Sequence, residues 1–436
     1  MKVLITGANG FVGGHVSRYL MARGIECVAL DVKGVPEQGV YSARTTWDDL
    51  DTLDLSTFDG VIHLAGKAHD TKNASDPQSY FDINVGLTKR VLGAVLKCES
   101  AKVLKLGEER SSSWQSQLAV EESGAVLKCE PASLGATPRQ VSALVGETKD
   151  QGHITNERMN YRTNALKFIF FSSVKACADT VEGVLTEECV PNPQTPYGKS
   201  KLEAEREVLK FEPASLRATP SQGSAKVLKL KEEVLTTRNA ENTKNIHLRQ
   251  GYGGQVEHSI EESEVQNFRT LELQNFRTFI LRPAMIQGPG NKGNMELLIK
   301  VVQKGIPWPL GAFENKRSFA SIENVSRVVE ALLIQDVEPG IYQVADDEPL
   351  STNQLIERIA ESLGRKPRIW KLPRGLMRGV ARVGDLLHLP LNSERLKKLT
   401  ESYVVSNAKL LRALGWELLR PHSGRKEVIK SNAFQA

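Results

Sequence analysis

A glycine-rich turn directly after the first apolar run constrains the fold of this chain more than any other feature. Residues 2–6 (KVLIT) have the pattern of a short buried strand, and residues 7–13 read GANGFVG at the start of a stretch that predicts a helix over residues 11–23. Glycines at this spacing allow a tight turn, a close approach of the backbone to a pyrophosphate, and close packing of the helix on the strand. The order of strand, turn and helix predicts a dinucleotide-binding unit.

A second predicted strand, over residues 26–31, ends in an acidic residue at the distance from the turn that such units require. The carboxylate of Asp31 can accept hydrogen bonds from the adenosine ribose, and it would repel a 2′-phosphate. This favours NAD over NADP, and Lys33 nearby keeps NADP as the alternative. The predicted cofactor contacts from this unit are Gly7, Asn9, Gly10, Phe11, Val12, Gly13 and Asp31.

Further apolar runs alternate with amphipathic stretches along the chain. Strands are expected at residues 60–64, 167–172, 278–282 and 340–344. Apolar runs that can be buried on both faces, separated by helical stretches, predict an α/β fold with a Rossmann-type, doubly wound parallel sheet.

Two segments with duplicated motifs interrupt this rhythm, at about residues 97–163 and 211–274. SAKVLKLGEE at residue 100 recurs as SAKVLKLKEE at residue 224, and EPASLGATP at residue 130 recurs as EPASLRATP at residue 212. The copies have no constant period, so they do not indicate a solenoid. Each segment follows a predicted helix and precedes a predicted strand, so we expect mobile inserts at the sheet edge away from the ligand.

A tyrosine and a lysine four residues apart carry the predicted chemistry. Tyr197 and Lys201 would share one face of a helix. A neighbouring ammonium and a positive nicotinamide would both lower the pKa of the phenol, so Tyr197 could remove a hydroxyl proton or return one to a carbonyl. Ser172 and Ser173 follow the apolar run KFIFF, where a hydroxyl can hold the reacting oxygen.

Together these motifs resemble the extended short-chain dehydrogenase/reductase family, the NAD-dependent epimerase/dehydratase group that includes UDP-glucose 4-epimerase. Within it, the chain is most similar to bacterial enzymes of surface-polysaccharide sugar synthesis. The matching stretches cover most of the chain outside the two inserts. They are GANGFVG, Asp31, VIHLAG from residue 61, residues 84–88, the serine strand, TPYGKSKLEAE from residue 195, LRPAMIQGPG from residue 281 and KRSFASIENV from residue 316.

The resemblance implies a division into two domains and a set of site residues. An NAD-binding domain would span residues 1–282, interrupted by the inserts, and a substrate-binding lobe residues 283–436, with residues 340–344 returning as a strand to the main sheet. The implied catalytic residues are Ser173, Tyr197 and Lys201. Further implied cofactor contacts are Leu64, Ala65, Gly66, Ser172, Tyr197, Lys201 and Pro283. The implied substrate contacts are Asn84, Ser173 and Arg317, whose guanidinium matches phosphate oxygens.

The resemblance also implies a reaction, an epimerisation of a nucleoside-diphosphate sugar through a keto-sugar. A keto-sugar reductase or dehydrogenase would use the same residues and stays open. Dehydration is disfavoured, because Val174 and Lys175 stand where dehydratases of the group carry an Asp-Glu pair. A non-enzymatic dinucleotide sensor is the alternative from another class. Such proteins typically lose the tyrosine or the lysine, and this chain keeps both.

Bulk properties narrow the partners and the location. The net charge of +5 is too small to indicate nucleic-acid binding, and neither histidines nor cysteines have the spacing of metal ligands. No run approaches the ~20 apolar residues of a spanning helix. We therefore expect a cytoplasmic protein with no metal and no membrane span; a homodimer would be usual for the group. His63 is expected to be a packed core residue.

One further stretch has two interpretations. Residues 373–389 place Arg374, Arg378 and Arg382 at helical spacing, with leucines and valines opposite. A helix lying on a membrane surface has this pattern. We favour an amphipathic helix of the substrate lobe, which has the same pattern.

Overall fold

The computed structural model describes residues 1–32, 39–67, 76–98, 165–210, 276–290, 294–387, 392–417 and 419. All of them belong to one compact unit, Met1–Cys98 with Ala165–Ala436. The two predicted inserts lie outside the described residues, apart from the first two residues of the first insert, which end a helix. Their position and mobility stay predictions.

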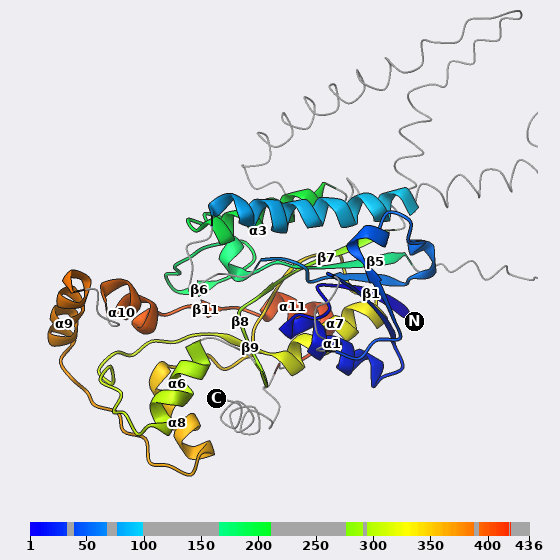
Figure 1. Ribbon diagram of the computed structural model, residues 1–436. Helices are drawn as coiled ribbons and strands as arrows, with labels where there is room; N and C mark the ends of the chain where they lie inside the picture. Colours follow the sequence, from blue (N-terminus) through cyan, green and yellow to red (C-terminus); the bar gives the residue numbers. More distant parts are fainter. Residues whose placement is uncertain are drawn as a thin grey trace, which may run out of the picture. The chain divides into compact units, whose positions relative to one another are not determined.

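A seven-stranded sheet in which every pair of neighbours is parallel forms the centre of this unit (Figure 1). Its order is β10-β7-β5-β4-β1-β2-β3. The strands are β1 (Lys2–Thr6), β2 (Glu26–Asp31), β3 (Ala43–Thr46), β4 (Gly60–His63), β5 (Leu166–Phe171), β7 (Phe276–Pro283) and β10 (Gly340–Val344). The predicted parallel sheet is confirmed. Because the chain moves outward from β1 to β3 and then continues with β4 on the other side of β1, the strand order reverses there, which is where such sheets bind ligands.

Helices cover both faces of this sheet. α1 (Phe11–Met21) and α7 (Ile322–Ile334) lie on one face, and α3 (Pro196–Leu209) and a helix over residues 77–98 lie on the other (Figure 1). α11 (Ala408–Leu414) packs beside β10. The described residues also include three single-turn 3₁₀ helices, η1 (Trp47–Asp49), η2 (Leu55–Thr57) and η4 (Val174–Ala176).

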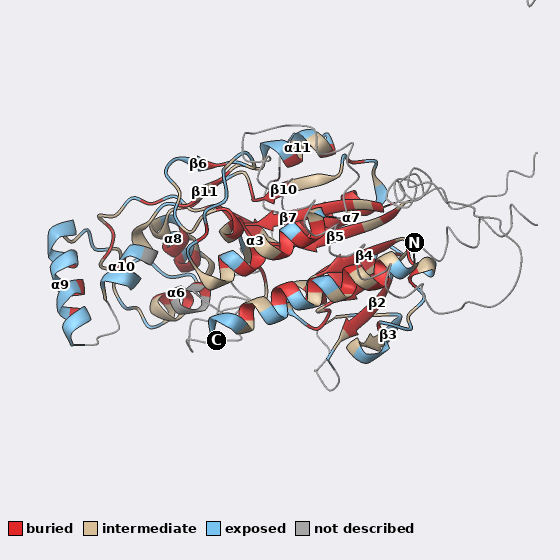
Figure 2. Ribbon diagram, turned by 90° about the horizontal axis from the view of Figure 1, so that it is seen from above, coloured by how far each residue is buried: buried red, intermediate tan, exposed pale blue. Residues whose placement is uncertain are grey.

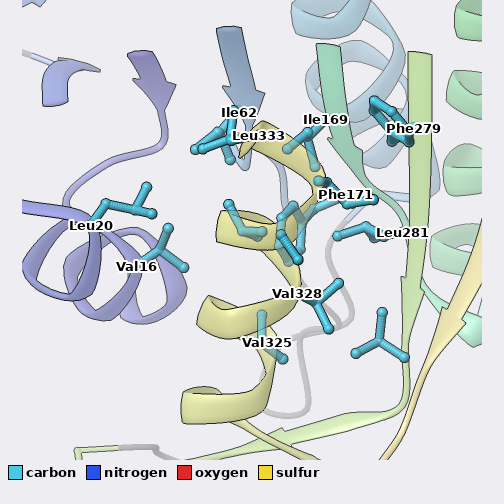
Figure 3. Packing of buried hydrophobic residues seen from close by; sticks show 14 of the residues in the cluster. Val16, Leu20, Ile62, Ile169, Phe171, Phe279, Leu281, Val325, Val328 and Leu333 are labelled. Carbon is cyan, nitrogen blue, oxygen red and sulfur yellow. The ribbon is translucent and has the colours of Figure 1, made fainter. Parts of the chain in front are cut away.

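The alternation of side chains along the strands explains why two cores form. In β5, Ile169 and Phe171 join the core under α1 and α7, whereas Phe168 and Phe170 join the core under α3. Figure 3 shows the first core, in which side chains of α1 and α7 meet those of the central strands. Its labelled residues are Val16, Leu20, Ile62, Ile169, Phe171, Phe279, Leu281, Val325, Val328 and Leu333.

A third core belongs to the C-terminal half of the chain. It gathers residues of α6 (Asn294–Gln303), α8 (Thr352–Ser362), α9 (Arg374–Leu386) and α10 (Ser393–Thr400). Two small parallel pairs join this region to the rest, β8 (Met285–Gln287) with β9 (Phe319–Ser321), and β6 (Val184–Leu185) with β11 (Val404–Val405).

The C-terminal half contributes more to the sheet layer than the one strand that the sequence predicted. β10 lies beside β7 as expected, but α7 and α11 also pack on the sheet layer. A division of the chain after residue 282 stays a prediction. None of the helices in the described ranges has the length and hydropathy needed to cross a membrane.

Candidate functional site

The glycine turn leaves no room for side chains at two positions. Gly7 has a φ of +65°, and a Cβ there would lie 2.7 Å from the backbone of Ala65. A Cβ on Gly13 would lie 2.5 Å from the carbonyl oxygen of Ala8. The turn is therefore built so that the start of α1 packs directly on the ends of β1 and β4.

The start of α1 fits the pyrophosphate of a dinucleotide. Gly10 supplies no side-chain cap, and the first helical turn holds no acidic residue, so the positive end of the helix dipole is not neutralised there. The side-chain oxygen Oδ1 of Asn9 is buried and has no hydrogen-bond partner among the described residues. The carboxylate of Asp31 accepts hydrogen bonds from the backbone N–H of Asn9 (2.7 Å) and of Val32 (2.8 Å), which places it beside the turn.

Residues 64–66 connect this turn to the predicted catalytic residues. They follow β4, and Gly7 is packed against their backbone. A Cβ on Gly66 would lie 2.7 Å from Oδ1 of Asn84 and 3.1 Å from Nζ of Lys201. The structure therefore brings the glycine turn, Asn84 and Lys201 to one place at the carboxyl edge of the sheet.

Asn84 lies on the helix over residues 77–98 and links this helix to two other segments. Its Nδ2 donates to Oγ of Ser200 at 2.9 Å, and its Oδ1 accepts from the backbone N–H of Lys67 at 2.7 Å. The residue is 1% exposed. Its amide thus fixes α3 against the loop after β4, while its predicted role as a substrate contact stays a prediction.

Ser173 and Tyr197 are in contact through their hydroxyl groups, which form a hydrogen bond. Ser173 is the N-cap of η4, directly after β5, and its Oγ accepts from the backbone N–H of Lys175 at 3.2 Å. Tyr197 lies in the first turn of α3, where its ring meets that of Tyr80 edge-on at 6.3 Å. Two of the three predicted catalytic side chains are therefore joined directly.

The electrostatics of this pair differ from the prediction. Burial raises the pKa of Tyr197 above its ordinary value, and the hydrogen bond with Ser173 opposes this rise only in part. Nζ of Lys201 donates to the carbonyl oxygen of Phe171 at 3.0 Å, and burial lowers the pKa of this amine to about 8 against the opposing charge of Glu205. Within the protein alone, desolvation of the phenolate outweighs the predicted lowering of this pKa by the lysine, and the contribution of a bound nicotinamide stays a prediction.

A buried ion pair beneath the site was missed by the sequence analysis. Glu205 accepts from Arg282 at 2.9 Å (Nε) and 2.6 Å (Nη2), and the two residues are 1% and 2% exposed. The Ser172 hydroxyl donates to the same carboxylate, so Glu205 already engages this predicted cofactor contact. Helical spacing could have indicated Glu205, which follows Lys201 by four positions on α3.

Two further predicted contacts, Pro283 and Arg317, come from the C-terminal half of the chain. Pro283 ends β7 at its carboxyl end, beside β10. Arg317 is half-buried, donates from Nε to the carbonyl oxygen of Glu401 at 3.2 Å, and pairs through its backbone with Tyr403. The Tyr403 hydroxyl donates to the carbonyl oxygen of Ala178 at 2.7 Å, in the loop after η4. Arg317 is thus connected to the segment that follows Ser173, and its contact with phosphates stays a prediction.

His63 is a packed core residue, as predicted. It is fully buried at the end of β4, with Nδ1 2.6 Å from Oγ1 of Thr6 and Nε2 3.0 Å from Oγ1 of Thr88. Burial, with a smaller contribution from the charge of Lys201, lowers its pKa to about 3. Across the described parts of the chain, no group of three His, Cys, Asp or Glu residues could hold a metal ion.

We expect His63 to make the protein sensitive to acid. The unfolded chain protonates this histidine near pH 6.5 and the folded chain only near pH 3, so stability falls as the pH drops through this window. At pH 5 the loss amounts to about 2 kcal/mol. Urea unfolding at pH 7 and pH 5 measures this effect. Between the two pH values, the unfolding free energy of the wild type should fall by about 2 kcal/mol more than that of His63→Gln. An equal loss in both proteins would mean that the ring is protonated in the fold.

Comparison with known proteins agrees with this geometry. Residues 3–113 match the model of the NAD dependent epimerase/dehydratase family. The match covers about a quarter of the chain. The matched region contains the glycine turn, Asp31, residues 64–66 and Asn84.

Curated relatives match over part of their length. The chain is 38% identical over 96 residues to the UDP-glucose 4-epimerase of Vibrio cholerae, covering 22% of this chain and 29% of the relative. It is 32% identical over 96 residues to the N-acetyl-alpha-D-glucosaminyl-diphospho-ditrans,octacis-undecaprenol 4-epimerase of Escherichia coli O157:H7, with the same two coverages. The chain thus aligns with less than a third of either relative.

Solved structures match over the full length. The NAD complex of the UDP-glucose 4-epimerase from Thermus thermophilus has a TM-score of 0.54 at 18% identity, covering 100% of this chain and 98% of that one. The UDP-N-acetylglucosamine 4-epimerase of Bacillus cereus has a TM-score of 0.54 at 14% identity, covering 100% and 99%. At these identities the match establishes the fold, and the predicted Rossmann-type class is confirmed.

Proposed function

We propose that this chain is an NAD-dependent nucleotide-sugar epimerase that acts through a keto-sugar. The observation that carries the proposal is the continuity of the site. The glycine turn contacts residues 64–66, these contact Lys201 and Asn84, and on the same helix as Lys201 the Tyr197 hydroxyl meets that of Ser173. A dinucleotide site and a proton-transfer pair therefore share one edge of the sheet.

The residues of the turn suit NAD. Gly7 and Gly13 keep the backbone bare for a pyrophosphate, the unpaired Asn9 Oδ1 can accept a hydrogen bond, and Asp31 ends β2 where a ribose would lie. When bound, NAD would supply a reversible acceptor for a hydride. A 2′-phosphate beside the Asp31 carboxylate would be repelled, which supports NAD over NADP.

The chain's own residues would handle the proton and the oxygen. Ser173 would hold the sugar hydroxyl, and Tyr197 would take its proton as the carbon becomes a ketone. After the keto-sugar has turned its other face, the same phenol would return the proton to the oxygen. Because burial raises the pKa of Tyr197, the first transfer needs positive charge beside the phenol, which the Lys201 ammonium and a bound nicotinamide would supply. Arg317 would bind the diphosphate through its guanidinium.

The names of the relatives support epimerisation over net reduction. Both curated relatives and both solved structures described above are 4-epimerases, of nucleotide sugars in three cases and of a lipid-linked sugar in the fourth. A keto-sugar reductase or dehydrogenase with the same residues is the second candidate. A homodimer, which is usual in this group, and a cytoplasmic location belong to the same proposal.

Proton NMR of the full-length protein with a panel of UDP-sugars distinguishes the candidates. An epimerase converts either of two epimeric UDP-sugars into a mixture of both. The reaction needs NAD and consumes no NADH overall. A reductase needs a keto-sugar and consumes NADH in equal amount. Binding of NAD without turnover on any substrate of the panel would favour a dinucleotide sensor and contradict the proposal.

A further inference from the structure

α9 packs into the fold by one edge only. Met377, Ala381 and Gly384 are its buried residues, and the first two belong to the third core. Beside this edge runs a second apolar strip that is about half exposed among the described residues. Its members are spaced three or four positions apart and are Leu376 (55% exposed), Val380 (44%), Val383 (52%) and Leu387 (60%). Figure 2 shows α9 as largely exposed.

The opposite flank of α9 is positively charged. Arg374, Arg378 and Arg382 are exposed and lie one above the other at intervals of four residues. Arg378 and Arg382 form no hydrogen bond or ion pair with the described residues. The helix therefore presents an apolar strip on one side and, on the opposite side, cations with no ion-pair partner among the described residues.

The loop that leads into α9 continues this composition. It carries four more exposed basic residues, Arg365, Lys366, Arg368 and Lys371, and an exposed tryptophan, Trp370 (56%). Three of these basic residues, together with Lys304, line a cavity of about 440 Å³. From residue 364 to residue 384 the chain has no acidic residue.

We propose that α9 and this loop, residues 365–387, form a docking surface for an anionic lipid bilayer. An amphipathic helix with arginines on its polar face lies in the plane of the bilayer interface, where leucine and valine side chains enter the acyl region and the cations meet lipid phosphates. Tryptophan prefers the same interface, and the basic cavity gives a phosphate headgroup a recess. A second copy of this surface is a poor partner, because seven basic residues from each chain would face one another.

The surface and the proposed catalytic site are on different parts of the chain. Docking therefore stands independently of the proposed function. It would place the protein at the membrane surface without any spanning helix.

Co-sedimentation of the full-length protein with vesicles tests the proposal. We expect the wild type to sediment with vesicles that contain about 30% phosphatidylglycerol, and to bind pure phosphatidylcholine at least about ten-fold more weakly. Since each basic residue near an anionic surface contributes about five-fold, Arg378→Gln with Arg382→Gln should weaken binding about 25-fold. Leu376→Gln with Val383→Gln should weaken it at least about ten-fold.

Matched variants separate this surface from general effects. Val190 (82% exposed) and Ile334 (60% exposed) are apolar residues outside the surface, and changing both to Gln should leave vesicle binding unchanged. Arg206→Gln with Arg412→Gln removes two charges elsewhere and serves the same purpose for the arginines. The changed side chains are all exposed, so circular dichroism should show folded proteins.

Three results would overturn the proposal. One is a wild type that does not sediment with anionic vesicles. Another is equal loss of binding in the matched variants, which would indicate unspecific attraction. The third is a dimer, measured by light scattering, that becomes a monomer in the Leu376→Gln/Val383→Gln variant, because the strip would then be a contact between copies of this chain.

Discussion

Tyr197→Phe is expected to reduce turnover by about 10³-fold while leaving NAD affinity nearly unchanged. The phenylalanine ring keeps the edge-on contact with Tyr80, but no group at this position can then exchange a proton with the sugar oxygen. Initial rates from the NMR assay measure the first effect, and quenching of protein fluorescence by NAD measures the second.

Tyr19→Phe is the matched control for this change. The Tyr19 hydroxyl donates to Glu330 on α7, far along α1 from the glycine turn, so its loss should not alter turnover. If Tyr197→Phe kept wild-type turnover, the phenol would have no part in proton transfer. If instead it lost NAD binding to the same extent as turnover, the effect would be on the cofactor site.

Glu205→Leu is expected to cost about 3–5 kcal/mol of unfolding free energy, because it leaves the guanidinium of Arg282 buried without its partner. Arg282→Met should have a similar cost for the converse reason. Combining the two should recover most of the loss, since apolar residues of similar volume can replace a buried pair at little cost. Urea unfolding of the four proteins gives the coupling energy directly.

A surface pair provides the control for the ion-pair cycle. Arg206 and Glu203 are 3.1 Å apart on α3 with 62% and 39% of their side chains exposed, so Arg206→Ala should cost no more than about 0.5 kcal/mol. A loss of that small size in Glu205→Leu would mean that the buried pair is hydrated. If the double variant lost as much unfolding free energy as the two single variants together, Glu205 and Arg282 would act independently.

Much of the site could be predicted because its signals are local. The glycine turn needs only neighbours in sequence, and the helical register of Tyr197 and Lys201 needs only α3. The sheet followed from apolar runs of strand length. β3 was missed because ARTT is short, polar and half-exposed, so hydrophobic patterning gives no signal there.

Other features depend on residues far apart in sequence. The pKa of Tyr197 is set by how many atoms surround the phenol, which the helix alone does not reveal. The ion pair joins α3 to β7 across 77 positions, and only the assembled sheet brings the two charges together. For α9, only the assembled lobe shows that one edge packs into the third core while an adjacent apolar strip stays exposed, and the membrane-surface interpretation stays a proposal.

The sequence by itself determined the α/β class, the position of the glycine turn and the residue types available for proton transfer, because these depend on short-range periodicity and on steric requirements of the backbone. Tertiary structure alone decided which side chains meet, how far burial shifts their pKa values and which apolar residues stay uncovered. These properties arise from the solvent that each group loses on folding, and that loss depends on every segment packed around it.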